Sequence, residues 1–295
     1  MQAAELSETF AAIVESAGAS VVRVEGRRRP SSGVVWADGV VVAASHALLG
    51  DEGFTVGLGD GADLPATLAG RDPGTDLAVL KIEPGKGSPA ALGDLTGVKV
   101  GHLVLMLARP GNTVRATSGI VSALGREPWR TRHGTEIERY LEADAPHQPG
   151  FSGGPLVGLD GRVLGINTTG LVRGVSLTVP AATVGKAVEH LLAHGKVRRG
   201  WLGLSMQPMH LPEEVRRSTG EEVGLLVLSV APGGPAEKAG IGYGDTLLRL
   251  GPDTVRDLSD LQAFLRDDHV GEAVPVKVLS GGKVKDLTLT IGERP

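Results

Sequence analysis

The sequence predicts a mainly β protein of two domains, an all-β barrel or sandwich followed by a smaller domain of mixed strands and helices. The first observation is the length, because 295 residues at about 150 residues per domain suggest two domains. The second is a series of short β-rich runs between residues 21 and 179, separated by Gly, Pro and Asp, as is typical of barrels and sandwiches. The third is a change of pattern after residue 195, where strands and helices mix.

Each element of the first domain has its own signal. Leu6, Phe10, Ile13 and Val14 recur at helical spacing and predict a short amphipathic helix near the N-terminus. A later helix begins at Pro180 and ends at Gly195, because glycine readily adopts the positive φ of a helix C-terminus. The strand-like runs between these helices include residues 21–24, 34–36, 40–44, 77–82, 103–107, 163–166 and 175–179.

A short basic segment between two glycines, residues 195–200, marks the boundary between the domains. We therefore predict domains over residues 1–197 and 198–295, the second having the size of one small domain. Its expected elements, in order, are a strand at 225–230, a helix starting at Pro235, a strand at 247–250, a second helix, and strands around 274–278 and 287–291.

The composition excludes several classes of protein. Hydrophobic residues at 41% and charged residues at 22% exclude an intrinsically disordered chain. The 44 glycines follow no three-residue period, which excludes collagen. Only 3% of residues are aromatic, so stacking platforms for single-stranded nucleic acid are not expected. A net charge of −4 gives no overall attraction to nucleic acid or anionic membranes.

The sequence carries no sign of a disulfide framework, a leader or a membrane span. There is no cysteine, so thiolate chemistry is impossible. The first 20 residues include Glu5, Glu8 and Glu15 and do not resemble a secretory signal peptide, and no run approaches ~18 apolar residues. If the chain is complete, we expect a cytoplasmic protein. If a signal or anchor was trimmed, we expect an extracytoplasmic or periplasmic one.

The string Gly-Phe-Ser-Gly-Gly-Pro at 150–155 is the most informative of the sequence. The glycines around Ser152 leave its hydroxyl accessible and allow backbone N–H groups to converge on one point. Such donors stabilise the oxyanion that forms when a hydroxyl attacks a carbonyl group. Taken alone, the string is equally compatible with a plain turn.

Two further residues support catalysis. His46 directly follows an apolar strand, a rigid position from which a base can accept the proton of a serine. Asp76 begins the next strongly apolar strand, where a carboxylate can orient an imidazole and stabilise its charged form. Singly, they are compatible with a core histidine and a turn residue. The order His, Asp, Ser within an all-β region is difficult to obtain by chance.

These and other motifs resemble the HtrA/DegP-type serine proteases. The motifs are Ala-Ser-His-Ala-Leu at 44–48, Thr-Asp-Leu-Ala-Val-Leu-Lys-Ile at 75–82, Thr-Ser-Gly-Ile-Val-Ser-Ala-Leu-Gly at 117–125, Gly-Phe-Ser-Gly-Gly-Pro-Leu-Val at 150–157 and Leu-Asp-Gly-Arg-Val-Leu-Gly-Ile-Asn-Thr at 159–168. The resemblance extends from about residue 10 to 291. It implies a chymotrypsin-like double β-barrel protease domain followed by a small α+β PDZ domain.

The resemblance also implies the roles of the site residues. Ser152 is expected to be the nucleophile, His46 the general base and then acid, and Asp76 the orienting carboxylate. The N–H groups of Gly150 and Ser152 are expected to form the oxyanion hole. Peptide hydrolysis would proceed through an acyl-enzyme and need neither metal nor nucleotide. The substrates would be unfolded or damaged polypeptides, cut without ATP in protein quality control and stress response.

The resemblance places the first substrate pocket near residues 166–170 and 175–178. Pro146 stands six residues before Ser152, where a protease for basic residues would want a carboxylate, and Arg173 is the charged residue nearby. We therefore predict a small or medium aliphatic side chain before the cleaved bond. The candidate pocket residues are Ile166, Asn167, Thr168, Val175 and Leu177.

The second domain supports the same resemblance. The string Trp201, Leu202, Gly203, Leu204 resembles the loop of PDZ domains whose N–H groups capture a peptide C-terminus while the peptide adds a strand to the sheet edge. Residues 224–230 and 232–245 match the strand, loop and helix that follow. The expected partners are therefore polypeptide substrates and peptide C-termini. The N-terminal helix with Phe10 resembles the segment through which relatives form homotrimers.

Some features depart from the family pattern. Phe151 precedes the serine where the family usually has Asn, and a ring there would reshape the oxyanion turn. The string Arg-Pro-Gly-Asn at 109–112 replaces the usual Gly-Asn-Pro-Phe-Gly, and the loops at 26–33 and 171–174 are short. The alternative function is therefore a catalytically silent scaffold or chaperone that binds peptides. The intact set of His46, Asp76 and Ser152 favours the protease.

Overall fold

The computed structural model describes residues 3–26, 29–125, 129–130, 136–137, 140–172, 175–195, 200–265 and 269–293. The chain divides into two compact units, Met1–Val197 and Arg198–Pro295. Residues 27–28, Arg173 and the basic segment 196–199 lie outside the described residues. Among those described, no helix has both the length and the hydrophobicity needed to cross a bilayer.

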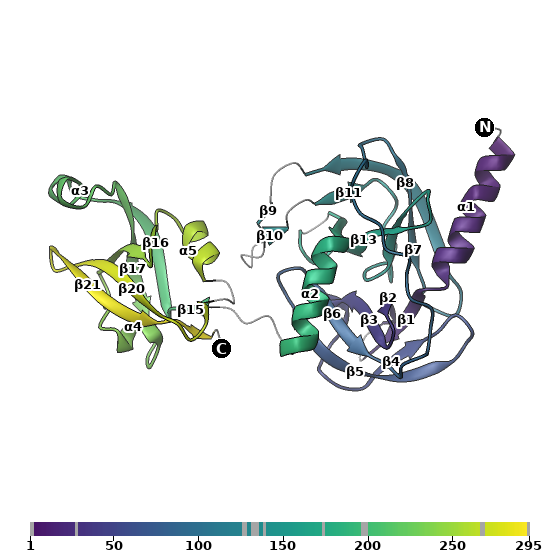
Figure 1. The fold of residues 1–295 in the computed structure, drawn as a ribbon, viewed down its shortest axis with the longest axis horizontal. Helices are drawn as coiled ribbons and strands as arrows, with labels where there is room; N and C mark the ends of the chain where they lie inside the picture. Colours follow the sequence, from purple (N-terminus) through teal and green to yellow (C-terminus); the bar gives the residue numbers. More distant parts are fainter. Residues whose placement is uncertain are drawn as a thin grey trace. The chain divides into compact units, whose positions relative to one another are not determined.

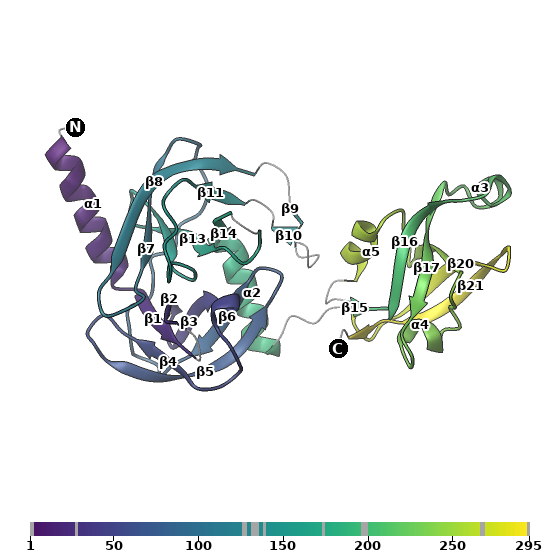
Figure 2. The same ribbon diagram turned by 180° about the vertical axis from the view of Figure 1, so that it is seen from behind.

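The first half of the larger unit is a closed, antiparallel, six-stranded barrel (Figures 1 and 2). Side chains alternate between its inside and outside, and both sides are buried. Val22, Val24 and Val41 fill the barrel, whereas Val21 and Val42 face the core shared with the second barrel. In spatial order, the strands are β1 (Val21–Glu25), β2 (Ser31–Ala37), β3 (Val40–Ala44), β6 (Leu77–Lys81), β5 (Asp63–Asp72) and β4 (Phe54–Gly57).

The second half is another closed six-stranded barrel. Its interior contains Val104, Met106, Leu141, Phe151 and Leu156, all buried. In spatial order, its strands are β11 (Leu141–Ala143), β14 (Leu177–Pro180), β13 (Val163–Thr168), β12 (Pro155–Gly158), β7 (Leu103–Ala108) and β8 (Arg115–Leu124). A separate pair, β9 (Trp129–Arg130) and β10 (Glu136–Ile137), lies outside this barrel.

Two helices accompany the barrels. α1 (Ala3–Gly18) precedes β1 and contacts β7. α2 (Ala181–His194; Figure 1) contacts strands of both barrels, and its buried side chains include Val184, Val188 and Leu191. Gly195 ends α2 in the left-handed conformation, with φ 75°. The two barrels therefore share one apolar core and form a single rigid framework for the loops between their strands.

The smaller unit contains a twisted antiparallel sheet covered by short helices. Its core includes Leu225, Val227, Leu247, Val276 and Leu289. The sheet order is β16 (Leu204–His210), β17 (Val223–Val230), β18 (Thr246–Leu250), β20 (Ala273–Ser280) and β21 (Lys283–Thr290), with β19 (Asp253–Thr254) on β18 and a separate pair of β15 (Gly200–Trp201) and β22 (Gly292–Glu293).

The helices of the smaller unit are α3 (Glu213–Thr219), α4 (Pro235–Lys238) and α5 (Leu258–Phe264). The sequence predicted α4 and α5 but not α3, which is seven residues long and buries only Val215. A helix with one buried residue has almost no hydrophobic periodicity, so its sequence does not distinguish it from a loop. The predicted fold class, a double β-barrel followed by a small α+β domain, is confirmed.

Candidate active site

Strand pairing brings His46 and Asp76 together. β3 and β6 run antiparallel with Ala44 opposite Leu77, so the residues after one strand and before the other meet. His46 lies in the short 3₁₀ turn η1 (Ser45–Ala47), and the N–H of Ser45 donates to the carbonyl of Asp76. The site thus begins at the rim of the first barrel, on rigid backbone.

The Asp76 carboxylate is buried and fully engaged. Its Oδ2 accepts from Nδ1 of His46 at 2.5 Å and from the hydroxyl of Thr168, while its Oδ1 accepts from the backbone N–H of His46 at 2.9 Å. Asp76 is the one described non-glycine residue with a positive φ, 58°, a conformation that Asp tolerates. Because Nδ1 donates its proton to the carboxylate, Nε2 of His46 is left as the proton acceptor.

Ser152 follows a tight turn. Pro149 and Gly150 occupy its corner, and the N–H of Phe151 closes it on the carbonyl of Gln148 at 3.1 Å. Gly150 has φ 89°, and a Cβ on it would lie 2.5 Å from Cβ of Pro110, so this corner requires glycine. Gly153, with φ 84°, is equally constrained, since a Cβ there would lie 2.1 Å from the carbonyl oxygen of Ser32.

The turn leaves two backbone donors available. Ser32 occupies the carbonyls on either side of Phe151, because its hydroxyl donates to Gly150 at 2.7 Å and its N–H to Ser152 at 3.3 Å. The N–H groups of Phe151 and Gly153 are also used. Within the described residues, the backbone N–H groups of Gly150 and Ser152 donate to no acceptor. They are the two groups expected to form the oxyanion hole.

The side chain of Phe151 lies outside the turn. Its side chain is fully buried and packs in the core of the second barrel with Val104, Met106 and Leu156. The ring therefore belongs to the barrel core, and only the backbone of Phe151 takes part in the turn. This position accounts for an apolar residue next to the serine.

His147 is a residue of the site that sequence reasoning missed. Its Nε2 lies 3.1 Å from Oγ of Ser152, and its Nδ1 lies 2.8 Å from Oγ of Ser176. Burial, and secondarily the charge of His46, lower the pKa of His147, which favours its neutral form. Within the described part of the chain, His147 and not His46 is the hydrogen-bond partner of the Ser152 hydroxyl. A histidine five residues before the serine was the available signal.

The five predicted pocket residues have different surroundings. Ile166 and Leu177 are buried in the core shared by the barrels, whereas Val175 is half-buried. Thr168 donates to Asp76, and the amide of Asn167 donates to the carbonyl of Gly154 at 3.0 Å. Thr168 and Asn167 thus support the carboxylate and the serine turn.

A cleft of about 640 Å³ runs past the candidate nucleophile. His46, Gly150 and Ser152 line it, together with the exposed Arg29 and Arg115. Among the described residues, no Asp or Glu lines this cleft. Its charged walls are therefore basic, although the chain as a whole carries a net charge of −4.

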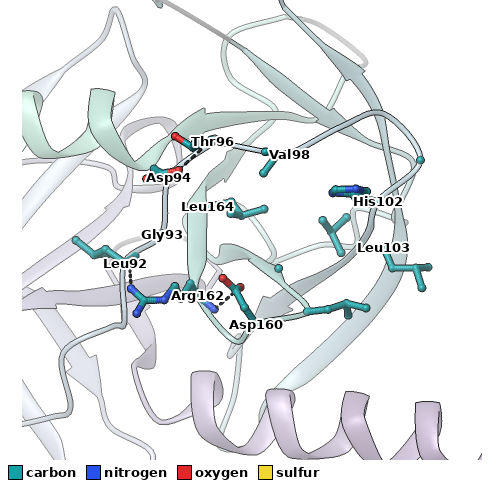
Figure 3. Close-up of a pocket in the computed structure, with 15 residues that line it drawn as sticks. Leu92, Gly93, Asp94, Thr96, Val98, His102, Leu103, Asp160, Arg162 and Leu164 are labelled. Carbon is teal, nitrogen blue, oxygen red and sulfur yellow. Dashed lines mark hydrogen bonds between the residues drawn. The ribbon is translucent and has the colours of Figure 1, made fainter. Parts of the chain in front are cut away.

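A larger cavity of about 840 Å³ lies elsewhere on the second barrel (Figure 3). Its polar groups are engaged in local structure, since Arg162 donates to the carbonyl of Leu92 at 3.0 Å and Asp94 accepts from the N–H of Thr96 at 2.6 Å. None of the predicted catalytic residues lines it. It therefore lacks the nucleophile and base that the first cleft has.

The predicted peptide-binding loop of the smaller unit lies at a sheet edge. Trp201 ends β15, Leu202 is buried, and Leu204 begins β16, an edge strand of the sheet. The carbonyls of Leu202 and Gly203 accept from Ala236 and Ala231, whereas their N–H groups donate to no acceptor among the described residues. α5 packs beside β16. Free N–H groups at the start of an edge strand suit a peptide carboxylate.

Comparisons with known proteins give the same architecture. Residues 31–166 match the trypsin-like peptidase domain, and residues 200–291 match the PDZ domain. A probable periplasmic serine endoprotease, DegP-like, from Brucella suis is 37% identical over 284 residues, covering 92% of this chain and 54% of the relative. A similarly named protein of Halomonas elongata is 35% identical over 280 residues, covering 92% and 58%. The chain spans little more than half the length of these relatives.

Solved structures match almost end to end. A serine endoprotease from Yersinia pestis has a TM-score of 0.77 with 29% identity, covering 97% of this chain and 98% of that one. The HtrA-type protease AlgW with a tripeptide has a TM-score of 0.71 with 31% identity, covering 97% of both chains. On these matches and the geometry above, the chain belongs to the HtrA family of DegP-like, trypsin-fold serine proteases with a PDZ domain.

Proposed function

We propose that this chain is an ATP-independent serine endopeptidase that cleaves unfolded or damaged polypeptides. The observation that carries the proposal is the fixed imidazole of His46, held through Nδ1 by Asp76, in the same cleft as a serine whose turn offers two unused N–H donors. A binding scaffold would need neither feature. The names of the relatives, which are serine endoproteases, support the same activity.

The geometry indicates the order of events. The hydroxyl of Ser152 turns from His147 to Nε2 of His46, which takes its proton as Oγ attacks the substrate carbonyl. The N–H groups of Gly150 and Ser152 hold the resulting oxyanion. The imidazolium, stabilised by Asp76, then protonates the leaving amine. Water, activated by the same imidazole, hydrolyses the acyl-enzyme and restores Ser152.

The smaller unit is proposed to bind peptide C-termini. A peptide would add a strand to the free edge of β16 and place its carboxylate on the N–H groups of the loop at Leu202 and Gly203. The solved AlgW structure, which contains a tripeptide, supports peptide recognition in the family. This binding would recruit substrate tails or regulate the protease.

Assembly and location are proposed as well. A homotrimer is proposed through α1 and Phe10, whose side chain is only partly buried in the unit. Size-exclusion chromatography with light scattering tests it, and a monomeric mass would contradict it. The names of the Brucella and Halomonas proteins contain the word periplasmic, and the same location is proposed here.

The test of the proposed activity is labelling with a fluorophosphonate probe, with casein digestion followed in parallel. Wild type is expected to be labelled and to digest casein, and Ser152→Ala to do neither while keeping its melting temperature. Absence of labelling in the wild type, with C-terminal peptides present to occupy the PDZ domain, would favour the scaffold. Labelling without casein digestion would indicate a protease of narrow specificity.

A further inference from the structure

His147 bridges the candidate nucleophile and the segment before β14. One ring nitrogen is bonded to Ser152, 3.1 Å away, and the other to Ser176, 2.8 Å away. With both nitrogens engaged, the ring is held across the space beside Ser152. The carbonyl group of the substrate that accepts from the N–H groups of Gly150 and Ser152 is bonded directly to the Cα that carries the side chain before the cleaved bond. That side chain must therefore come close to the His147 ring.

An aliphatic side chain fits this ring poorly. It would leave Nε2 of His147 either on Ser152, in competition with His46, or buried without a partner. A hydrogen-bond acceptor on the substrate would instead give Nε2 a new partner and release the Ser152 hydroxyl. Sites built on polar groups reject ligands that leave those groups unpaired.

The charge around the site selects among the acceptors. Arg29 and Arg115 line the adjoining cleft, and its described lining includes no carboxylate. The carboxylate of Asp76, which holds His46, is covered by His46 and Thr168. A basic cleft raises the local concentration of anionic segments. A carboxylate therefore has an advantage over a neutral amide or hydroxyl group.

We propose that the pocket beside Ser152 takes an acidic side chain, Glu or Asp, before the cleaved bond, with His147 as the specificity-determining residue. The proposal rests on the serine endopeptidase function and replaces the aliphatic preference expected from the sequence. In the bound state, Nε2–H of His147 donates to the substrate carboxylate and Nδ1–H to Ser176. The imidazole takes up one proton from solvent, and Ser152 turns to His46.

The proton uptake has a physical cause. Burial and the charge of His46 oppose the cationic form of the free His147 ring and lower its pKa. A carboxylate in contact with the ring opposes both effects. The substrate thus supplies the charge that makes its own binding partner cationic.

The test uses three peptidyl phosphonate probes that differ only in the residue at the reacting end: Glu, its uncharged isostere Gln, or Val. The rate at which each modifies Ser152 is followed by intact mass. For wild type, we expect Glu to react at least about tenfold faster than Gln and Val, the discrimination expected of one charge-assisted hydrogen bond. In His147→Gln and His147→Leu, the ratio of Glu to Gln is expected to fall to about one.

His102→Gln is the matched control, because His102 is an exposed histidine that lies on the other cavity (Figure 3). It is expected to keep the full preference for Glu. Equal or faster reaction of wild type with Val, or a preference for Glu that survives in both His147 variants, would overturn the proposal. A wild-type rate for Val that equals or exceeds the rate for Glu refutes the proposal even if a variant fails to fold.

A fluorophosphonate without a recognition residue separates the two proposals. If it labels Ser152 while the three peptidyl probes react alike, the endopeptidase function stands and the role of His147 is refuted. If it labels nothing, both proposals fail together.

Discussion

Replacement of Phe151 by Asn, the residue usual in the family at this position, is expected to destabilise the protease unit rather than activate it. Phe151 is fully buried among Val104, Met106 and Leu156. Truncation of a buried Phe costs about 3–5 kcal/mol in the free energy of unfolding. A buried amide without partners adds about 1–3 kcal/mol. The loss, about 4–8 kcal/mol, is a large part of the 5–15 kcal/mol typical of a domain.

Differential scanning calorimetry of the full chain measures this effect. One kcal/mol lowers the melting temperature of a unit of this size by about 2–4 °C, so a fall of at least about 8 °C is expected in the transition of the protease unit. The transition of the PDZ unit should stay in place and act as an internal reference. Phe264, buried in the PDZ unit, provides the reciprocal control, since Phe264→Asn should lower the other transition.

Phe151→Leu is the matched variant, because it keeps an apolar side chain in the core and should lose much less stability. A melting temperature unchanged by Phe151→Asn would refute the assignment of the ring to the core. A sharp rise in fluorophosphonate labelling per folded molecule would refute the conclusion that the native turn is already set.

Four further predictions follow from particular contacts. Asp76→Asn should lower the rate of fluorophosphonate labelling by about 10⁴-fold, because Asn favours the wrong tautomer of His46. The protein should stay folded, because Asn tolerates the positive φ of this position. A loss of less than tenfold would contradict the role of Asp76. The buried guanidinium of Arg109 donates to the carbonyls of residues 18, 21 and 112. In Arg109→Lys a single ammonium group faces these three acceptors, so the free energy of unfolding should fall by about 2–4 kcal/mol. The loss is measured as a lower melting temperature of the protease unit. No shift in that transition would argue against this network. The pKa of His147 lies below its ordinary value of about 6.5 because of burial. As the pH is lowered, the His147 ring therefore takes up a proton in the unfolded chain before it does so in the folded one, and the stability of the folded state falls below about pH 6.5. His147→Gln should flatten the fall in melting temperature between about pH 7 and pH 5, and a parallel curve would contradict the assigned pKa direction. A peptide with a free C-terminus should bind the PDZ unit at least about tenfold more tightly than its C-terminal amide, measured by calorimetry, whereas equal affinities would exclude the proposed loop.

The fold and the family could be read from the sequence because their signals are local. Apolar runs broken by turn residues mark the strands, and the strings around His46, Asp76 and Ser152 each occupy a few consecutive residues. The positive φ of Gly150 also belongs to a single turn, although the close approach of Pro110 to this glycine is a tertiary contact. Such features can be recognised without knowledge of the tertiary structure, because they follow from backbone geometry and hydrophobic periodicity.

Only the tertiary structure decided which way the other side chains of the site point. The sequence predicted that the ring of Phe151 would reshape the oxyanion turn, whereas the structure places this ring in the barrel core. Thr168 was predicted to line the substrate pocket, and the structure shows that its hydroxyl donates the third hydrogen bond to the Asp76 carboxylate. His147 was passed over, although it binds Ser152 and, 29 residues away, Ser176. These contacts depend on strands that pair far apart in the chain, and no local pattern records the direction of a side chain across such a pairing.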